Sequence, residues 1–149
     1  MSSLRRQSTR VAVLDPDDRV LLIRARDPAP PHAETLLLPG GAAEGDETLE
    51  QAALRELREE TGLALPRLDG FLGSVETEFE LGGRHRMQRE AVFFAQVDRV
   101  VVDAAVLVAG VEHAAELLDV AWWPLDDALS SGLPVYPDQL PALLEGLKR

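Results

Sequence analysis

Three glutamates, Glu56, Glu59 and Glu60, are spaced so that they can act together on one helix. At about 100° per residue, Glu60 lies about 40° and Glu59 about −60° from Glu56, so the three carboxylates share one sector of the helix surface. Ala52 and Leu57 fall on the same side of the helix. The glutamates are therefore predicted to face the body of the protein, where unpaired carboxylates repel each other and lose solvation.

A divalent cation would offset both of these costs. Oxygen ligands suit Mg²⁺ or Mn²⁺, and the sequence has no cysteine that could supply a thiolate to zinc or an iron–sulfur cluster. The alternative is a solvated acidic surface in which Arg55 and Glu59 form an ion pair one helical turn apart. The shared sector favours the metal site.

Both ends of this helix have sequence signals. Thr48 and Gln51 have the spacing of a capping box, which predicts the start, and Gly62 fits the left-handed residue that ends many helices. Gly40 and Gly41 would let the preceding loop double back beside the helix. The same glycine pair could instead form a phosphate-binding turn.

The remaining pattern predicts one α/β domain with a mixed sheet over residues 1–149, frayed at residues 1–7. Strands are predicted at Ser8–Leu14, Arg19–Ile23, Leu36–Leu38, Phe71–Phe79, Met87–Val97 and Val120–Pro124. Short helices are predicted at Leu125–Ser130 and Gln139–Leu147. Arg84–Arg86 is predicted to be a turn, and Val111–Leu118 a short helix or an acidic loop.

The segment Gly40–Leu63 resembles the Nudix box, G-x5-E-x7-R-E-U-x-E-E-x-G-U, where U is aliphatic. Every fixed position is filled at the right spacing, by Gly41, Glu47, Arg55, Glu56, Leu57, Glu59, Glu60, Gly62 and Leu63. The resemblance implies an α/β/α sandwich and hydrolysis of a nucleoside diphosphate linked to another group. Nucleoside triphosphates, ADP-ribose-like sugars, dinucleoside polyphosphates and capped ends all fit that description.

The resemblance also implies the metal site. Glu56, Glu59 and Glu60 are the expected ligands of Mg²⁺ or Mn²⁺, together with the backbone carbonyl of Gly40. In the same family the arginine of the box pairs with the glutamate of the loop, which here implies a contact between Arg55 and Glu47.

A carboxylate must accept the proton of the attacking water. We expect this base to be Glu56, or Glu59 if Glu56 is committed to the metal. Some proteins of the family take a base or a further ligand from a late loop, where Glu112 and Glu116 are the candidates. The alternative for each, and the favoured one, is a solvated surface residue.

Several arginines could bind the phosphates of a substrate. Arg84, Arg86 and Arg89 cluster in and after the Gly-Gly turn of a predicted hairpin, and Arg24 and Arg26 end an earlier strand. The alternative for the first three is a solvated hairpin tip. No sequence pattern identifies the substrate.

Composition limits the partners. The net charge of −11 disfavours a polymeric nucleic acid, and no apolar run is long enough to span a membrane. Cytoplasmic residence is expected, and a homodimer is compatible with the resemblance. Two other classes remain: a nucleotide-binding sensor that does not cleave its ligand, and an isomerase of diphosphate substrates, although the latter often uses a cysteine, which this chain lacks.

Overall fold

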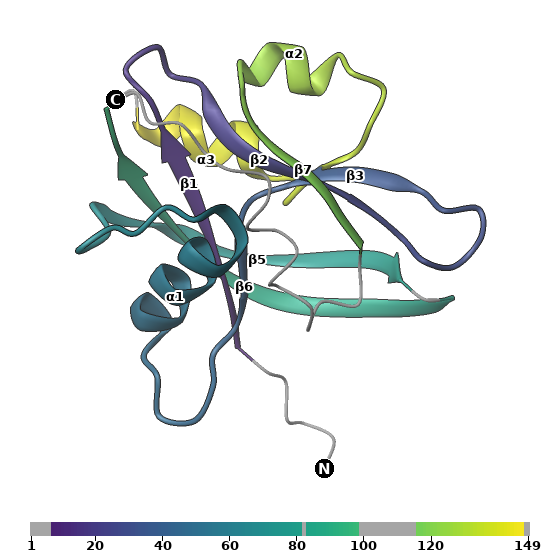
Figure 1. Ribbon diagram of the computed structural model, residues 1–149, viewed down its shortest axis with the longest axis horizontal. Helices are drawn as coiled ribbons and strands as arrows, with labels where there is room; N and C mark the ends of the chain where they lie inside the picture. Colours follow the sequence, from purple (N-terminus) through teal and green to yellow (C-terminus); the bar gives the residue numbers. More distant parts are fainter. Residues whose placement is uncertain (1–6, 82, 99–115, 148–149) are drawn as a thin grey trace.

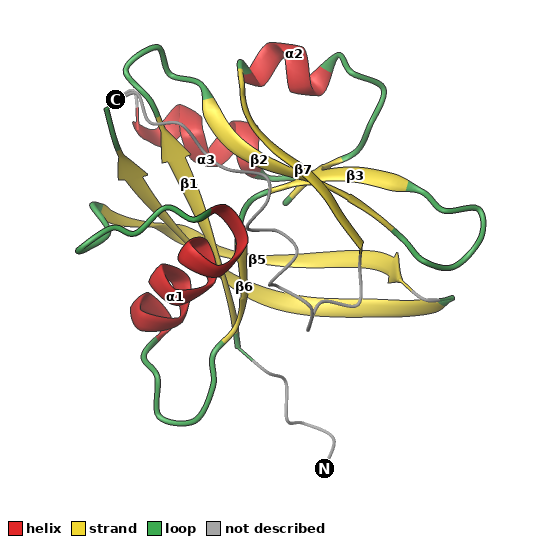
Figure 2. Ribbon diagram, viewed as in Figure 1, coloured by secondary structure: helices red, strands yellow, loops and turns green. Residues whose placement is uncertain are grey.

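A computed structural model of the protein describes residues 7–81, 83–98 and 116–147. In these ranges the strands join in one mixed sheet with helices on both faces (Figures 1 and 2). The strands are β1 (Ser8–Leu14), β2 (Val20–Arg26), β3 (Glu34–Leu37), β4 (Gly40–Ala42), β5 (Gly70–Leu81), β6 (Arg84–Gln96), β7 (Glu116–Trp123) and β8 (Val135–Tyr136). The helices are α1 (Leu49–Thr61), α2 (Leu125–Leu129) and α3 (Leu140–Leu147). Each of these helices is too short or too polar to cross a membrane.

The sheet separates two apolar clusters. Because side chains alternate along a strand, Val11 and Val13 of β1 pack on one face and Ala12 and Leu14 on the other. The first cluster includes Leu57 of α1, and the second includes buried side chains of α2 and α3. The expected α/β/α sandwich is therefore confirmed.

Strand β1 pairs with three other strands, β2, β4 and β6. It pairs with β6 in parallel along its whole length. Its other edge is shared, because β4 pairs with Ser8–Arg10 and β2 pairs only at the far end, through Leu14 and Val20. This division brings the loop that precedes α1 directly against β1.

Gly40 lies where β4 and β1 approach most closely. A Cβ atom added to Gly40 would lie 1.9 Å from the carbonyl oxygen of Thr9 and 2.8 Å from the Cα of Arg10. The neighbouring contact is a backbone hydrogen bond of 2.9 Å from the Val11 amide to the Pro39 carbonyl. Only a glycine fits at this approach.

Helix α1 begins and ends as predicted. The Thr48 hydroxyl accepts a hydrogen bond from the Gln51 amide at 3.1 Å, and the Gln51 side chain accepts one from the Thr48 amide at 2.9 Å. Gly62 ends the helix in the left-handed conformation, with φ of 78°. Both signals are local in the sequence, which is why they could be interpreted without the fold.

Two predicted segments were wrong. Arg84–Arg86 is not a turn but the beginning of β6, since Arg84 already pairs with Leu81 of β5. Residues 116–118 are neither helix nor acidic loop but the start of β7, which pairs with β2; the rest of that segment lies outside the described residues. In both places, pairing with a neighbouring strand overrode the local pattern.

Candidate active site

The inner side of α1 carries carboxylates, as its angular spacing predicts. Glu56 and Glu60 are only 8% and 1% exposed, among buried alanines and Leu57. The Glu59 side chain is 43% exposed at the border of this face. The helix therefore buries two of the three predicted carboxylates and leaves the third in contact with solvent.

Glu60 joins the helix to the loop that precedes it. Its Oε1 accepts a hydrogen bond from the Gly40 amide at 2.8 Å. The contact spans 20 residues of sequence and is buried. This hydrogen bond holds the Gly40 backbone and the Glu60 carboxyl group in a fixed position relative to each other.

Gly41 leaves space for the carboxylate of Glu56. A Cβ atom at Gly41 would lie 2.6 Å from Cδ and 2.8 Å from each carboxylate oxygen of Glu56. The first glycine of the box is therefore required by a side chain of the helix, whereas Gly40 is required by the backbone of β1.

This difference predicts the effect of Gly41→Ala. The methyl group would displace the far end of a flexible side chain, so we expect little change in thermal stability. Because the displaced group is the Glu56 carboxylate, activity should fall by about 10-fold or more, the scale seen when the support of a reacting group is disturbed. Steady-state kinetics and thermal unfolding check this, with Gly146→Ala, whose added Cβ would meet no atom within 4 Å, as the control. Full activity in Gly41→Ala would contradict the placement.

Arg55 connects the loop to the helix. Its Nε and one Nη donate to both oxygens of Glu47, at 2.7 and 2.9 Å. The same Nη donates to the Ala42 carbonyl at 3.0 Å, and the other donates to Glu56 at 2.9 Å and Glu59 at 3.3 Å. The expected contact between Arg55 and Glu47 is present and is bidentate, the strongest form of such a pair.

Arg55 has more negative charges around it than its one positive charge can balance. Its guanidinium is shared by the carboxylates of Glu44, Glu47, Glu56 and Glu59. The hydrogen bond to Glu47 raises the pKa of Arg55 above its ordinary value. One guanidinium cannot balance four carboxylates, so the site has an excess of negative charge that would attract a cation.

The hydrogen bonds from Arg55 and, after it, from the Glu44 amide lower the pKa of Glu47 below its ordinary value of 4.5. These interactions therefore contribute in full to the free energy of unfolding above pH 4.5. Their contribution is lost as the pH falls through the pKa that Glu47 has in the folded protein. We expect the free energy of unfolding, measured with urea, to decrease in this acidic range. In Glu47→Gln the decrease should be smaller, while Glu44→Gln should follow the wild type. Parallel curves for wild type and Glu47→Gln would contradict the assignment.

The donor set fits a hard divalent cation in kind. Glu56, Glu59 and Glu60 offer carboxylate oxygens, and Gly40, whose amide donates to Glu60, has a backbone carbonyl to offer. Within the described part of the chain, no three acidic or histidine side chains converge closely enough to form a complete metal site. The described residues thus include suitable ligands on one helix and its preceding loop, but their side chains do not converge on one point.

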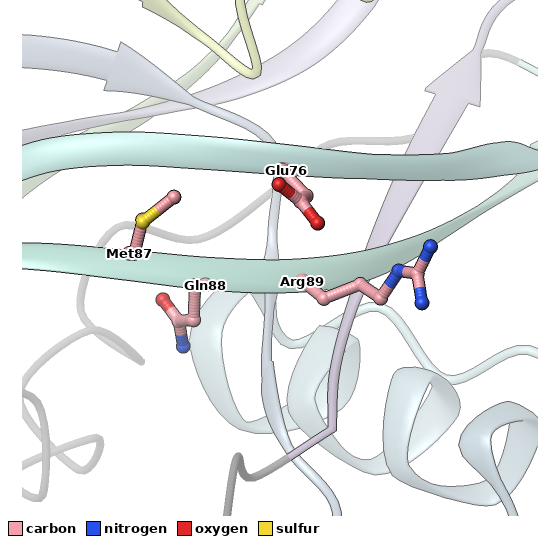
Figure 3. Close-up of a pocket in the computed structure, with 4 residues that line it drawn as sticks. All are labelled: Glu76, Met87, Gln88 and Arg89. Carbon is pink, nitrogen blue, oxygen red and sulfur yellow. The ribbon is translucent and has the colours of Figure 1, made fainter. Parts of the chain in front are cut away.

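The predicted arginines of the hairpin lie on β6. Arg84 and Arg89 are exposed, and Arg89 pairs across the ribbon with Glu76. A shallow depression beside this pair is lined by Glu76, Met87, Gln88 and Arg89 (Figure 3). The depression contains no glutamate of α1. The side chain of Arg86 lies outside what the structure describes.

The other predicted site residues lie in different surroundings. Glu112 lies outside the described residues. Glu116 accepts two hydrogen bonds from Arg26, at 2.8 and 3.1 Å, on the exposed surface. Arg24 approaches Glu34 only to 3.7 Å, and its buried Nε has no hydrogen-bond partner in the described ranges. Of the two arginines of β2, Arg24 is therefore the better candidate to bind an anion.

Two charged residues were not predicted. Arg10 on β1 and Glu90 on β6 form an ion pair that is largely buried. Each stands directly before an apolar run of its strand, as RVAVL in the first case and EAVFFA in the second. A charged residue at that position was the available signal, but only the register of β1 and β6 brings the two together.

The fold, the glycine-bounded loop and the carboxylates of α1 together define a Nudix-type hydrolase. The sequence matches the NUDIX domain over residues 4–143, so the chain belongs to the Nudix family.

Three known proteins illustrate what this chain is similar to. An ADP-ribose pyrophosphatase from Methanocaldococcus jannaschii is 39% identical over 61 residues, which are 41% of this chain but only 34% of that protein. A MutT NUDIX hydrolase from Burkholderia pseudomallei has a similar structure, with a TM-score of 0.65, 29% identity and coverage of 93% of this chain and 95% of that one. The NUDIX domain of Shewanella oneidensis NrtR, solved with ADP ribose, has a TM-score of 0.68 at 24% identity and covers 99% of this chain and 89% of that one.

Proposed function

We propose that the protein is a metal-dependent hydrolase that cleaves the diphosphate of a nucleoside diphosphate linked to another group. The observation that carries this proposal is the position of Glu56 and Glu60, buried on the inner side of α1 beside Gly40 and Gly41. Buried carboxylates one helical turn apart repel each other, and a divalent cation would add to the compensation that Arg55 and the Gly40 amide give them. The excess of negative charge around Arg55 supports the same conclusion.

Glu56, Glu59, Glu60 and the Gly40 carbonyl would hold Mg²⁺ or Mn²⁺. When bound, such an ion neutralises phosphate oxygens and makes a coordinated water more acidic. Arg55 and Glu47 hold the loop against the helix, so they position the ligands without touching the substrate. Water attacks one phosphorus, and the bond from that phosphorus to the bridging oxygen breaks, so two phosphorylated products leave.

The proton of the attacking water is taken by Glu56 or Glu59. The Glu56 carboxylate is held by Arg55 and against Gly41, which suits a ligand of fixed position. The Glu59 side chain is much more exposed, which gives water access to it. The dependence of kcat on pH in Glu59→Gln separates the two: loss of the acidic limb assigns the base to Glu59, and its retention leaves Glu56.

We propose an ADP-ribose-like nucleoside diphosphate sugar as the first substrate to test. The matching segment of an ADP-ribose pyrophosphatase supports this choice, as does the NUDIX domain solved with ADP ribose. Arg24, whose side chain is 43% exposed, would bind the substrate's phosphates through the accessible nitrogens of its guanidinium. Arg84, Arg86 and Arg89 are the further candidates, on the β5–β6 ribbon.

The test is a panel of nucleoside diphosphate sugars, nucleoside triphosphates and dinucleoside polyphosphates with Mg²⁺ and with Mn²⁺. We expect metal-dependent release of a nucleoside monophosphate from an ADP-ribose-like substrate. The sensor function is favoured instead if calorimetry detects binding of ADP-ribose at saturating metal while no product forms. A NUDIX domain of the same fold was solved with ADP ribose, which is why ADP-ribose is the ligand chosen to test this alternative.

A further inference from the structure

A buried ion pair lies on the sheet face opposite α1. Arg10 on β1 donates from Nε to one carboxylate oxygen of Glu90 on β6, and Thr77 on β5 donates to the other at 3.2 Å. The two charged side chains are 17% and 3% exposed. Arg10 is on the same face as Ala12, which packs with the cluster of α2 and α3. A buried ion pair is often no more stabilising than an apolar pair of similar size, so its role lies in what it positions.

Arg10 contacts the segment that leads into the candidate site. Its Nη1 donates to the Leu38 carbonyl at 2.9 Å. The backbone of β1 donates to the Pro39 carbonyl at 2.9 Å, and the Gly40 amide donates to Glu60 at 2.8 Å. Three consecutive residues are thus held, the first by the ion pair, the second by the strand and the third by the catalytic helix.

We propose that Arg10 and Glu90 are positioning residues that fix the Leu38–Gly40 segment and, through it, the Glu60 carboxylate. Glu90 orients the guanidinium, and the guanidinium orients the Leu38 carbonyl two residues before the Gly40 amide. Side chains on one face of the sheet thereby set the position of a carboxylate on the other. The consequence for catalysis rests on the proposed metal-dependent function.

The geometry requires an arginine. Nε binds Glu90 while Nη1 binds the Leu38 carbonyl, and only a planar guanidinium presents two donors in a fixed arrangement. A lysine would preserve the charge and make one of these contacts. Arg10→Lys is therefore expected to have an effect smaller than that of Arg10→Met.

The experiment compares Arg10→Met, Arg10→Lys and Glu90→Gln with the wild type. It measures the exchange of the Gly40 amide and the Kd for Mn²⁺ in the protein without substrate, and then kcat and KM. Hydrogen exchange by NMR reports the Gly40 amide, and electron paramagnetic resonance reports Mn²⁺ binding without substrate. We expect faster exchange of Gly40 and a Kd for Mn²⁺ raised by about 10-fold or more, the scale for residues that support a metal ligand. At low Mn²⁺ kcat should fall, with recovery at saturating Mn²⁺ and an unchanged KM.

Arg19→Met is the matched control. Arg19 also donates from Nε to a buried carboxylate, that of Asp15, at 2.7 Å, but at the other end of β1. Its loss should lower the thermal midpoint without changing Gly40 exchange or Mn²⁺ binding. Glu90→Gln keeps the side chain's size and an acceptor oxygen, so it tests the pair even if Arg10→Met unfolds.

The outcomes separate the two proposals. Unchanged Gly40 exchange and Mn²⁺ affinity in Arg10→Met and Glu90→Gln overturn the positioning role, as does an equal change in Arg19→Met, which would indicate general loss of stability. A Mn²⁺ affinity that is the same in wild type and Glu60→Gln would instead remove the proposed metal site. In that case the Gly40 exchange still decides whether the pair positions the loop.

Discussion

Glu60→Gln is expected to lower kcat by about 100-fold or more, because a bound metal ion contributes several kcal/mol of transition-state stabilisation and Glu60 is one of its proposed ligands. The substituted side chain keeps an oxygen that can accept the hydrogen bond from the Gly40 amide. It also removes a buried negative charge, so thermal stability should be unchanged or higher. The loss of activity would therefore reflect the lost carboxylate.

Glu50→Gln is the control for this prediction, because Glu50 lies in the first turn of the same helix and is exposed. Its loss removes only a favourable interaction with the helix dipole, about 1 kcal/mol or less. We expect its kinetics to match those of the wild type. Wild-type turnover in Glu60→Gln would reject Glu60 as a metal ligand, whatever the substrate.

Gly40→Ala is expected to destabilise the fold by about 3 kcal/mol, the upper range for an overpacked buried position. The added methyl would collide with the Thr9 carbonyl and the Arg10 Cα, which are backbone atoms and cannot rotate away. Strands β1 and β4 would have to separate. For a chain of this size the thermal midpoint should fall by roughly 6 to 12 °C, which calorimetry or circular dichroism measures.

Gly146→Ala is the matched substitution. It lies in α3 with no atom near the added Cβ, so helix propensity should raise stability by up to about 1 kcal/mol. If Gly40→Ala were as stable as the wild type, the close approach of β4 to β1 would be wrong. With Gly41→Ala, the set separates the two adjacent glycines, the first needed by the fold and the second by the carboxylate of Glu56.

The local parts of the site could be predicted from the sequence. The capping box at Thr48, the left-handed end at Gly62 and the inward sector of Glu56 and Glu60 all depend on residues within about one or two helical turns of each other. The contact between Arg55 and Glu47 depended on the family resemblance, and the structure contains it. The exposure of Glu59 was not predicted, because the border of a buried face depends on what packs against it.

Contacts between distant segments could not be predicted in this way. Residues 84–86 contain turn-like polar side chains, but pairing with β5 continues the strand through them. Arg10 and Glu90 are 80 residues apart, and nothing local to either indicates its partner. Only the parallel register of β1 and β6 places them within reach of each other.

The sequence by itself determined a helix with a defined start, a defined end and carboxylates directed inward, because helix geometry relates neighbouring residues directly. Only the tertiary structure shows why each of two adjacent positions requires a glycine. The backbone of β1 excludes a side chain at Gly40, and the carboxylate of Glu56 excludes one at Gly41. Only the fold also decided that an ion pair on the opposite face contacts the same loop. Those constraints arise from strands that meet across long stretches of chain, and residue types alone do not encode which strands meet.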